Sequence, residues 1–136
     1  MAVQINGTTG ITTPKLDTLD LELGSKNVVE RGSNANGEYV RFADGTQICV
    51  ATRDFTDITN AQGSLFISQS TQWYFPATFV GSGPTYTGAD ARSFGGVWAS
   101  SGASPINGDS CSFSFLRVIS YSGAFKGHLV AIGRWY

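Results

Sequence analysis

An Asp-Gly turn between two apolar-rich runs is the feature that most constrains how this chain can fold. The residues before it, Glu38–Ala43, and those after it, Thr46–Val50, have the composition of β-strands. Asp44-Gly45 predicts a two-residue type I′ turn, because both of its central residues must take a positive φ, which these two tolerate best. The sequence therefore predicts an antiparallel β-hairpin at this position.

A two-residue turn also fixes which residues of the hairpin face one another. It places Val40 opposite Cys49 and Phe42 opposite Gln47, so that apolar side chains lie on both faces. One face then carries Val40, Phe42, Gln47 and Cys49, and the other carries Tyr39, Arg41, Ile48 and Val50. Since neither face is purely polar, we expect the hairpin to be covered on both sides. A partner chain is one way to provide that cover.

The hairpin and the last residues of the sequence together carry a family resemblance. Residues 33–49 read S-N-A-N-G-E-Y-V-R-F-A-D-G-T-Q-I-C, and residues 131–136 read A-I-G-R-W-Y. These two motifs resemble the opening and the end of the C-terminal domain at the tips of many bacteriophage tail fibres. The resemblance covers roughly residues 32–136. The family also shares an aromatic-Phe-Pro-Ala-x-Phe run, matched here by Phe75, Pro76 and Phe79, which makes those residues scaffold.

The resemblance implies an architecture, an assembly and a location. The fold it implies is all-β, a small antiparallel β-sandwich with a short N-terminal anchor or stalk, assembled as a homotrimer. Residues 1–31 are expected to attach the chain to other virion proteins of a tail or capsid, and residues 32–136 to form the receptor-binding domain. The protein is then made in the host cytoplasm and located in the virion as a tail fibre.

Charge and hydropathy exclude several classes of function. The net charge is −1 and charged residues make up 14% of the chain, so no electrostatic argument favours nucleic acid or an anionic membrane. No apolar run is long enough for a transmembrane helix, and the first ten residues do not have the pattern of a signal peptide. We therefore expect Cys49 and Cys111 to be reduced, small core residues, with a mutual disulfide as the alternative.

Apolar alternation and turn residues predict the remaining elements. Leu19, Leu21 and Leu23 alternate with acidic residues as in a strand, although Leu16, Leu19 and Leu23 also fit one helical face after Pro14. A link is expected at 26–30, a turn-rich joint at 32–37 and a turn at 121–126. Further strands are expected at 65–70, 71–80, 94–100, 111–120 and 127–136, with loops at 81–88 and 100–109. Pro76 should lie at an edge or bulge, because it lacks a backbone donor.

Catalytic chemistry is not predicted. His128 is the sole histidine of the sequence, and it reads as a surface or partly buried strand residue. A metal held by three copies of His128 on a trimer axis is the alternative. Asp44, Asp54 and Asp57 do not form a clear acid–base pair for glycoside hydrolysis, because the first belongs to the turn. We expect no enzyme activity and no cofactor.

A binding surface is what remains, and aromatic residues in or beside loops are its candidates. Aromatic rings stack on sugars and anchor protein epitopes, while planar polar groups bond to hydroxyls. The candidate receptor-binding residues are Tyr86, Asp90, Arg92, Trp98, Asn107 and Tyr121. The expected receptor is a glycan or an outer-membrane protein of the bacterial surface. Two alternatives stay open, a structural or decoration protein that binds no receptor, and a carbohydrate-degrading tailspike.

Overall fold

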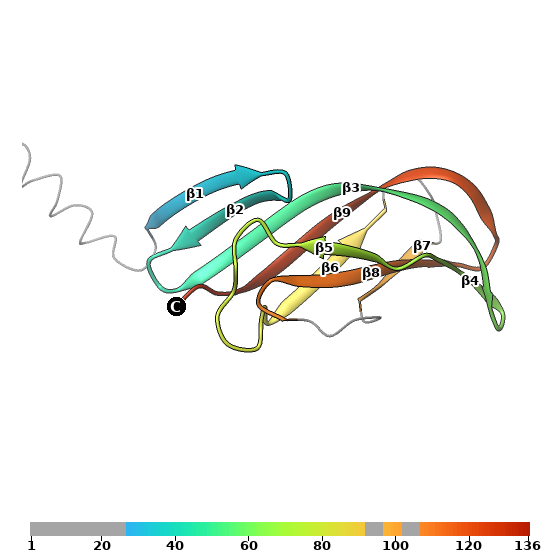
Figure 1. Ribbon diagram of the computed structural model, residues 1–136. Coiled ribbons are helices and arrows are strands. Elements are labelled where there is room, and N and C mark those ends of the chain that lie inside the picture. The colour runs from blue at the N-terminus through green and yellow to red at the C-terminus, as the bar shows by residue number, and fades with distance from the viewer. Residues whose placement is uncertain (1–26, 92–96, 102–106) are drawn as a thin grey trace, which may run out of the picture.

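The described part of the chain is all-β. The computed structural model describes residues 27–91, 97–101 and 107–136, and within these residues it contains strands and no helix (Figure 1). The strands are β1 (Val28–Asn34), β2 (Gly37–Phe42), β3 (Thr46–Gln62), β4 (Leu65–Ser68), β5 (Thr71–Tyr74), β6 (Tyr86–Asp90), β7 (Val97–Ser101), β8 (Ser110–Arg117) and β9 (Tyr121–Arg134). The all-β expectation is therefore confirmed. No helix among these residues is long and apolar enough to cross a membrane.

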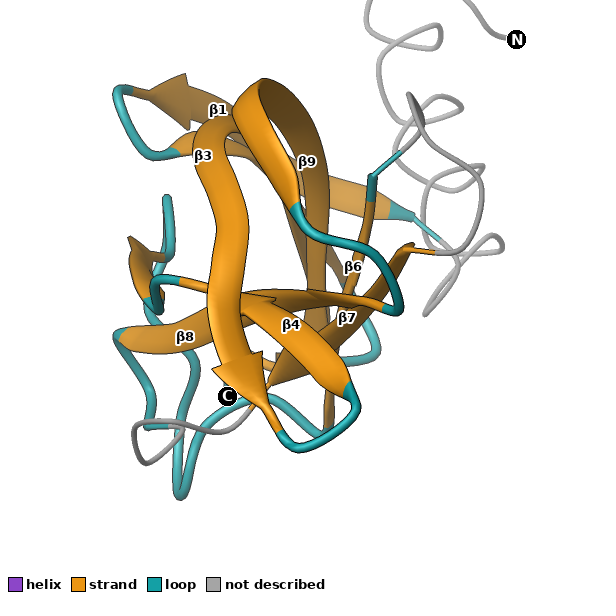
Figure 2. Cartoon of the chain, turned by 90° about the vertical axis from the view of Figure 1, so that its right-hand side faces the viewer, coloured by secondary structure: helices purple, strands orange, loops and turns teal. Residues whose placement is uncertain are grey.

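All strand pairs are antiparallel and belong to one curled, nine-stranded sheet. One part has the order β1-β2-β3-β9-β6, and its longest pairing joins β3 to β9 from Thr46 opposite Arg134 to Ile58 opposite Tyr121. In the other part β8 pairs with β4 and β5 along one edge and with β7 along the other. Figure 2 shows β4 and β8 running across the direction of β3 and β9.

A bulge in β3 accompanies the curl of the sheet. The register between β3 and β9 shifts between Thr56 and Ile58, and Asp57 between them has a φ of 51°. The Asp57 carboxylate accepts a hydrogen bond of 2.7 Å from the backbone N–H of Gly123, which holds the bulge against β9. Bulges bend a strand and increase its twist. β3 therefore leaves β9 beyond this point and pairs with β4.

The core lies inside the curl and is mainly aromatic. Phe55 packs edge-to-face on Phe115 with ring centroids 4.7 Å apart, and Phe75 packs edge-to-face on Phe79 at 5.0 Å. Offset and edge-to-face contacts of this kind add to the free energy that burial already provides. The other large core side chains are Ile58, Trp73, Phe113, Phe125 and Leu129, with the free thiols of Cys49 and Cys111 among them. The predicted scaffold role of Phe75 and Phe79 and the predicted core role of both cysteines are confirmed.

The hairpin is present, but its predicted turn and register are wrong by one residue. Tyr39 pairs with Cys49 and Arg41 with Gln47, which leaves a three-residue loop at 43–45. In that loop only Gly45 has a positive φ, of 92°, and the Asp44 carboxylate accepts a hydrogen bond from the N–H of Thr46. A three-residue loop that ends in a left-handed glycine is the next common hairpin connection after the two-residue turns.

The shift of one residue exchanges the faces of β2 relative to those of β3, so that Tyr39 and Arg41 share a face with Gln47 and Cys49. The face toward the core carries Tyr39, Arg41, Gln47 and Cys49, and the opposite face carries Glu38, Val40, Ile48 and Val50. Gln47 and Cys49 are fully buried, whereas Val50 is 42% exposed. The expectation that both faces carry apolar residues survives the correction, and one of those faces is not covered by the described residues.

Several other boundaries differ from the sequence prediction. β5 ends at Tyr74, since Phe75-Pro76 leaves the sheet where proline cannot donate. Residues 121–126, expected as a turn, belong to β9, and β1 occupies the expected link at 26–30 and part of the joint at 32–37. The strand expected at 127–136 is present as part of β9, which lies between β3 and β6. The elements considered at residues 14–23 lie outside the described residues.

Candidate functional site

Strands β2, β3, β9 and β6 turn one face away from the aromatic core, and we call this surface the outer face. Its residues follow from the register, because residues opposite one another in adjacent strands point to the same side. Three rows cross it: Val40–Ile48–Ile132–Tyr86, then Glu38–Val50–Val130–Gly88, then Thr52–His128–Asp90. The first row is apolar apart from one hydroxyl, and the third is polar.

Tyr86 lies flat on this face. It begins β6 and its side chain is 56% exposed. A Cβ atom at Gly88 would come within 2.5 Å of the Tyr86 hydroxyl oxygen, so the ring lies across this glycine. Any larger residue at position 88 would lift the ring from the sheet. Gly88 therefore allows β6 to present one face of an aromatic ring to solvent.

The Tyr86 ring borders a hollow of about 600 Å³ on the outer face. We call it the Tyr86 hollow. Its lining comes from β2, β3, β6 and β9 and comprises Gly37, Glu38, Val50, Ala51, Thr52, Tyr86, Gly88, Ala89, Asp90, His128, Leu129 and Val130. The Val50 and Val130 side chains supply an apolar lining, and the polar residues belong to the second and third rows. An aromatic ring beside an apolar lining with a few polar groups is the usual composition of a small-molecule site.

The polar side of the hollow is built around His128. Its Nδ1 lies 3.1 Å from the Oγ1 of Thr52, and Asp90 is its direct cross-strand partner on β6. Glu38 lies on the opposite side, on β2. These groups provide a hydroxyl, an imidazole and two carboxyl groups. Such groups can bond to the hydroxyls of a ligand whose apolar side rests on Tyr86.

Two of the six predicted receptor-binding residues meet in this hollow, namely Tyr86 and Asp90. Both lie on a strand, whereas the sequence pattern placed Tyr86 in a loop. Arg92 lies outside the described residues. Trp98 pairs with Leu116 through β7 and β8, and only its backbone is described.

The remaining two predicted residues act as scaffold in other parts of the fold. The Asn107 side-chain oxygen accepts hydrogen bonds from the N–H groups of Asp109 and Ser110, at 2.8 and 2.9 Å, so it shapes the turn before β8. The Tyr121 ring packs on Phe125 with ring centroids 6.3 Å apart, and the Arg117 guanidinium lies over it. Neither residue lines the Tyr86 hollow.

Sequence reasoning missed His128, Thr52 and Gly88 as parts of this hollow. One local signal was available, because a tyrosine two residues before a glycine on a strand can cover the bare backbone with its ring. The same relation occurs at Tyr121 and Gly123, where an added Cβ would lie 3.0 Å from the tyrosine hydroxyl. No local sequence pattern predicted that His128 lies opposite Asp90, because this position depends on the pairing of β6 with β9.

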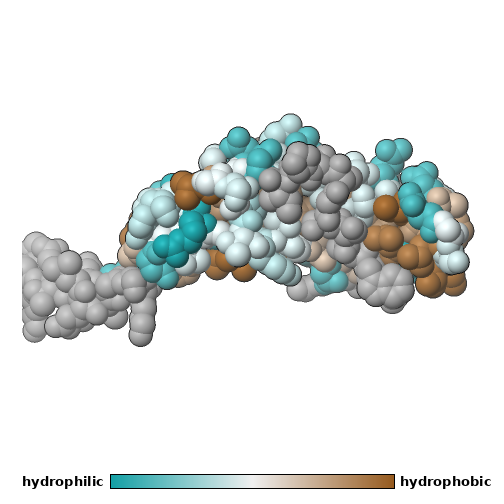
Figure 3. Space-filling model, turned by 90° about the horizontal axis from the view of Figure 1, so that it is seen from below, coloured by the Kyte–Doolittle hydropathy of each residue, from teal (hydrophilic) through white to brown (hydrophobic). Residues whose placement is uncertain are grey.

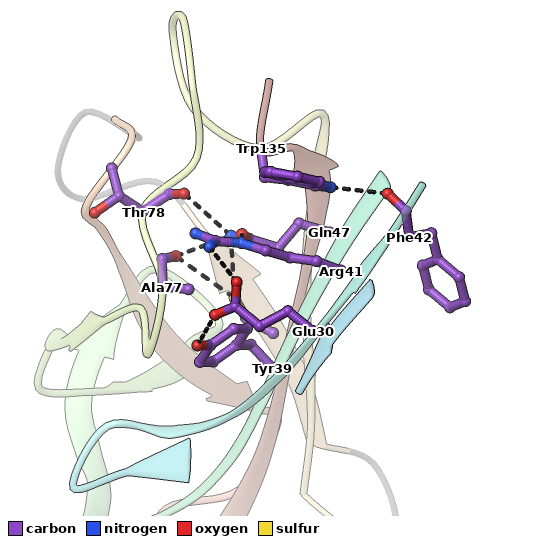
Figure 4. A network of polar contacts seen from close by, with 9 residues as sticks. Glu30, Tyr39, Arg41, Phe42, Gln47, Ala77, Thr78 and Trp135 are labelled. Atoms are coloured by element: carbon purple, nitrogen blue, oxygen red, sulfur yellow. Dashed lines mark hydrogen bonds and ion pairs between the residues drawn. The ribbon is translucent and has the colours of Figure 1, made fainter. Parts of the chain in front are cut away.

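The motifs that carried the family resemblance build a second polar cluster, on the core side of the hairpin (Figure 4). Arg41 donates from Nε to the Gln47 side-chain oxygen at 2.8 Å and from Nη1 to Glu30 at 3.0 Å. Gln47 donates to the carbonyls of Ala77 and Thr78 at 2.9 and 3.3 Å. The cluster therefore ties β1, β2 and β3 to the loop that follows β5.

Aromatic residues enclose this cluster. The Arg41 guanidinium carbon lies 5.3 Å from the ring centroid of Tyr39 and 5.2 Å from that of Trp135. Trp135 donates from Nε1 to the carbonyl of Phe42 at 2.9 Å. The Tyr39 hydroxyl donates to Glu30, and this bond together with Arg41 lowers the pKa of the Glu30 carboxyl. The same bond raises the pKa of Tyr39.

Further motif residues also make structural contacts. Asn34 donates from its side chain to the carbonyl of Pro76 at 2.9 Å, and Arg134 donates to the carbonyl of Asp44 at 2.5 Å. The two ends of the resemblance thus hold the hairpin, the loop after β5 and the end of β9 together. These residues support the fold and do not line the Tyr86 hollow.

The described residues offer no metal-binding group of three or more histidine, cysteine or acidic side chains. Asp44, Asp54 and Asp57 are exposed, and each carboxylate makes its own separate contact. Asp54 pairs with Lys126 at 2.5 Å, Asp57 holds the bulge, and Asp44 caps the hairpin loop. They do not line a common cleft, in agreement with their predicted role as surface charges.

One solved structure shares this architecture. No family model and no curated protein matches the sequence. The fold is similar to that of an N-truncated R1-type pyocin tail fiber, with a TM-score of 0.57 and 13% sequence identity. The similarity covers 95% of this chain and 99% of that chain. At this identity the likeness establishes a shared fold. That shared fold agrees with the tail-fibre resemblance of the sequence.

Proposed function

We propose that this chain is a fibre protein of a phage tail or a phage-tail-like particle, and that it recognises the surface of a bacterial host. Two independent sources support the proposal. One is the fold shared with a pyocin tail fiber. The other is the pair of motifs that resemble tail-fibre tips, whose residues converge on one structural cluster around Arg41, Gln47 and Trp135.

In this proposal the finer assembly follows the tail-fibre resemblance. Three chains form a homotrimer in which each curled sheet acts as a small β-sandwich. Residues 1–31 attach the chain to other virion proteins, and residues 32–136 carry the receptor-binding domain. The protein acts by binding, without covalent chemistry, cofactor, nucleic acid or membrane insertion.

The Tyr86 hollow is the proposed receptor site. The observation that carries this choice is the Tyr86 ring, which lies across Gly88 and leaves one aromatic face exposed beside His128 and Asp90. Exposed tyrosines are frequent anchors of binding energy at protein interfaces, and their rings also stack on the C–H faces of sugars. A receptor on the bacterial surface, either a glycan or an outer-membrane protein, is the ligand of this site.

An adsorption-blocking assay tests the proposal. Purified full-length protein should compete with phage particles for candidate bacteria, and Tyr86→Ala should lose at least tenfold in blocking potency, since an aromatic anchor contributes about 2 kcal/mol or more. Tyr74→Ala is the matched control, because Tyr74 on β5 is 54% exposed and lies outside the Tyr86 hollow. Equal blocking by both variants would place the receptor site elsewhere.

A structural or decoration protein without receptor binding is the alternative. Its support is that Asn34, Arg41 and Arg134, three residues of the resemblance, make contacts that hold the fold together. Under this alternative the wild-type protein assembles onto particles, but it does not block phage adsorption to any candidate host.

A further inference from the structure

The outer face continues beyond the Tyr86 hollow onto β2 and β1, and there it is apolar. A second hollow, of about 390 Å³, is lined by Val40, Ile48 and Val50 and shares Glu38 and Val50 with the first. We call it the Val40 hollow. Val40 and Ile48 are direct cross-strand partners, and the described residues leave both half-buried. No strand of the described chain packs over this surface, because β1-β2-β3-β9-β6 turns its opposite side to the core.

Antiparallel sheets with one face in water normally carry polar residues on that face. Here three branched aliphatic side chains stand next to one another instead. Contiguous apolar surface of this kind marks interaction sites on soluble proteins. The Val40 hollow is therefore expected to be covered by a partner, and the charges at its border indicate which partner this is.

Two charged residues of opposite sign border the Val40 hollow. Arg31 on β1 pairs with Val40, and Glu38 on β2 pairs with Val50, so both belong to the outer face. Both side chains are exposed, and neither forms an ion pair within the described residues. The surface is therefore self-complementary, since the Arg31 of one chain can pair with the Glu38 of another.

We propose that the Val40 hollow is the contact surface for a second copy of this chain. Three copies turn this surface toward a common axis, so that their aliphatic floors pack together there and Arg31 of each copy bonds to Glu38 of the next copy. The proposal rests on the homotrimer of the proposed function and adds the surface that forms it. It also leaves the Tyr86 ring and Asp90 outside the contact, because neither lines the Val40 hollow.

Light scattering on the full-length chain tests the proposal without host cells, so a failed adsorption assay does not affect the result. The wild-type protein should have about three times the mass of one chain at micromolar concentration. Val50→Asp should reduce this mass to that of one chain while the circular dichroism spectrum stays unchanged. Val80→Asp is the matched control, because Val80 is 44% exposed and lies outside both hollows, and it should keep the wild-type mass.

A charge exchange tests the pairing directly. Arg31→Glu and Glu38→Arg should each lower the fraction of assembled chain, and the double variant should restore it, since the opposite charges again face each other between copies. A monomeric wild-type protein, a Val50→Asp variant with the wild-type mass, or loss of assembly in Val80→Asp would each overturn the proposal. A double variant no better assembled than the single ones would overturn the Arg31–Glu38 contact.

Discussion

The buried amide of Gln47 offers a sharp test of how the hairpin is held to the rest of the fold. Gln47 is 0% exposed, donates to the carbonyls of Ala77 and Thr78, and accepts a bond from Nε of Arg41. Gln47→Leu keeps most of the side-chain volume and removes all three hydrogen bonds. It leaves the Ala77 carbonyl without its side-chain donor and the Arg41 Nε without its side-chain acceptor. We therefore expect this substitution to destabilise the fold.

The expected loss follows from the groups left unpaired. A buried polar group without its partner costs roughly 1–3 kcal/mol, so two such groups cost roughly 2–6 kcal/mol. For a chain of this size about 1 kcal/mol corresponds to roughly 3–5 °C of melting temperature, so Gln47→Leu should melt on the order of 10–15 °C below the wild type. The measurement is a thermal melt at one fixed protein concentration, because assembly makes the melting temperature depend on concentration.

Gln62→Leu is the matched control for this experiment. Gln62 is the last residue of β3 and is exposed. Surface substitutions usually change the free energy of unfolding by less than about 0.5 kcal/mol, so this variant should melt within roughly 2–3 °C of the wild type. If Gln47→Leu melts at the same temperature as the control, the cluster around Arg41 does not stabilise the hairpin and the reasoning is refuted.

Two further predictions concern the thiols and the last residues. Burial raises the pKa of Cys49 to about 11 and that of Cys111 to about 12, so a thiol reagent at pH 8 should label neither residue in the native protein and both in denaturant. Because the folded-state pKa is raised above the ordinary thiol value of 9.0, stability should be constant below pH 9 and fall as the pH rises toward 11; rapid native labelling would contradict the burial. Deletion of Trp135 and Tyr136 removes the bond to Phe42 and the ring over Arg41, and should lower the melting temperature by several degrees. An unchanged melting temperature would show that these two residues do not stabilise the domain.

Local composition was sufficient to predict that the chain is all-β and where much of its core lies. Apolar alternation identified the strands around Val40, Phe66 and Phe113, and the family resemblance correctly assigned Phe75 and Phe79 to the scaffold. The strand predictions needed only the preference of each side chain for a buried, pleated surface. Strand existence was therefore more predictable than strand boundaries.

The turn at Asp44 shows why the details could not be predicted. Asp-Gly suits a two-residue turn, but the Asp44 carboxylate bonds to the N–H of Thr46, and the chain forms a loop of three residues. The difference in local energy between such turns is small, yet it changes which face of β2 lies beside which face of β3. The length of β3 could not be predicted from the sequence for a related reason. Its polar second half faces solvent on one side and has a bulge at Asp57.

The candidate site was predictable only in part. Tyr86 and Asp90 were found because aromatic and acidic residues near glycine-rich segments often bind ligands. His128 and Thr52 join them through strand pairings between residues far apart in the sequence, which no local pattern encodes. Arg41 and Trp135, by contrast, belong to the recognised motifs but serve the fold, so motif membership did not identify the site.

The position of β9 has a consequence for how the protein is made. β9 pairs with β3 on one side and with β6 on the other, although it follows both of them in the sequence by more than thirty residues. A nascent chain that has not yet released Tyr121–Arg134 from the ribosome therefore keeps β3 and β6 each with an unpaired edge. Such edges are sites of aggregation, and loop closure over such distances is slow. Incomplete chains should consequently be found with chaperones and proteases, and only chains that include β9 should reach assembly.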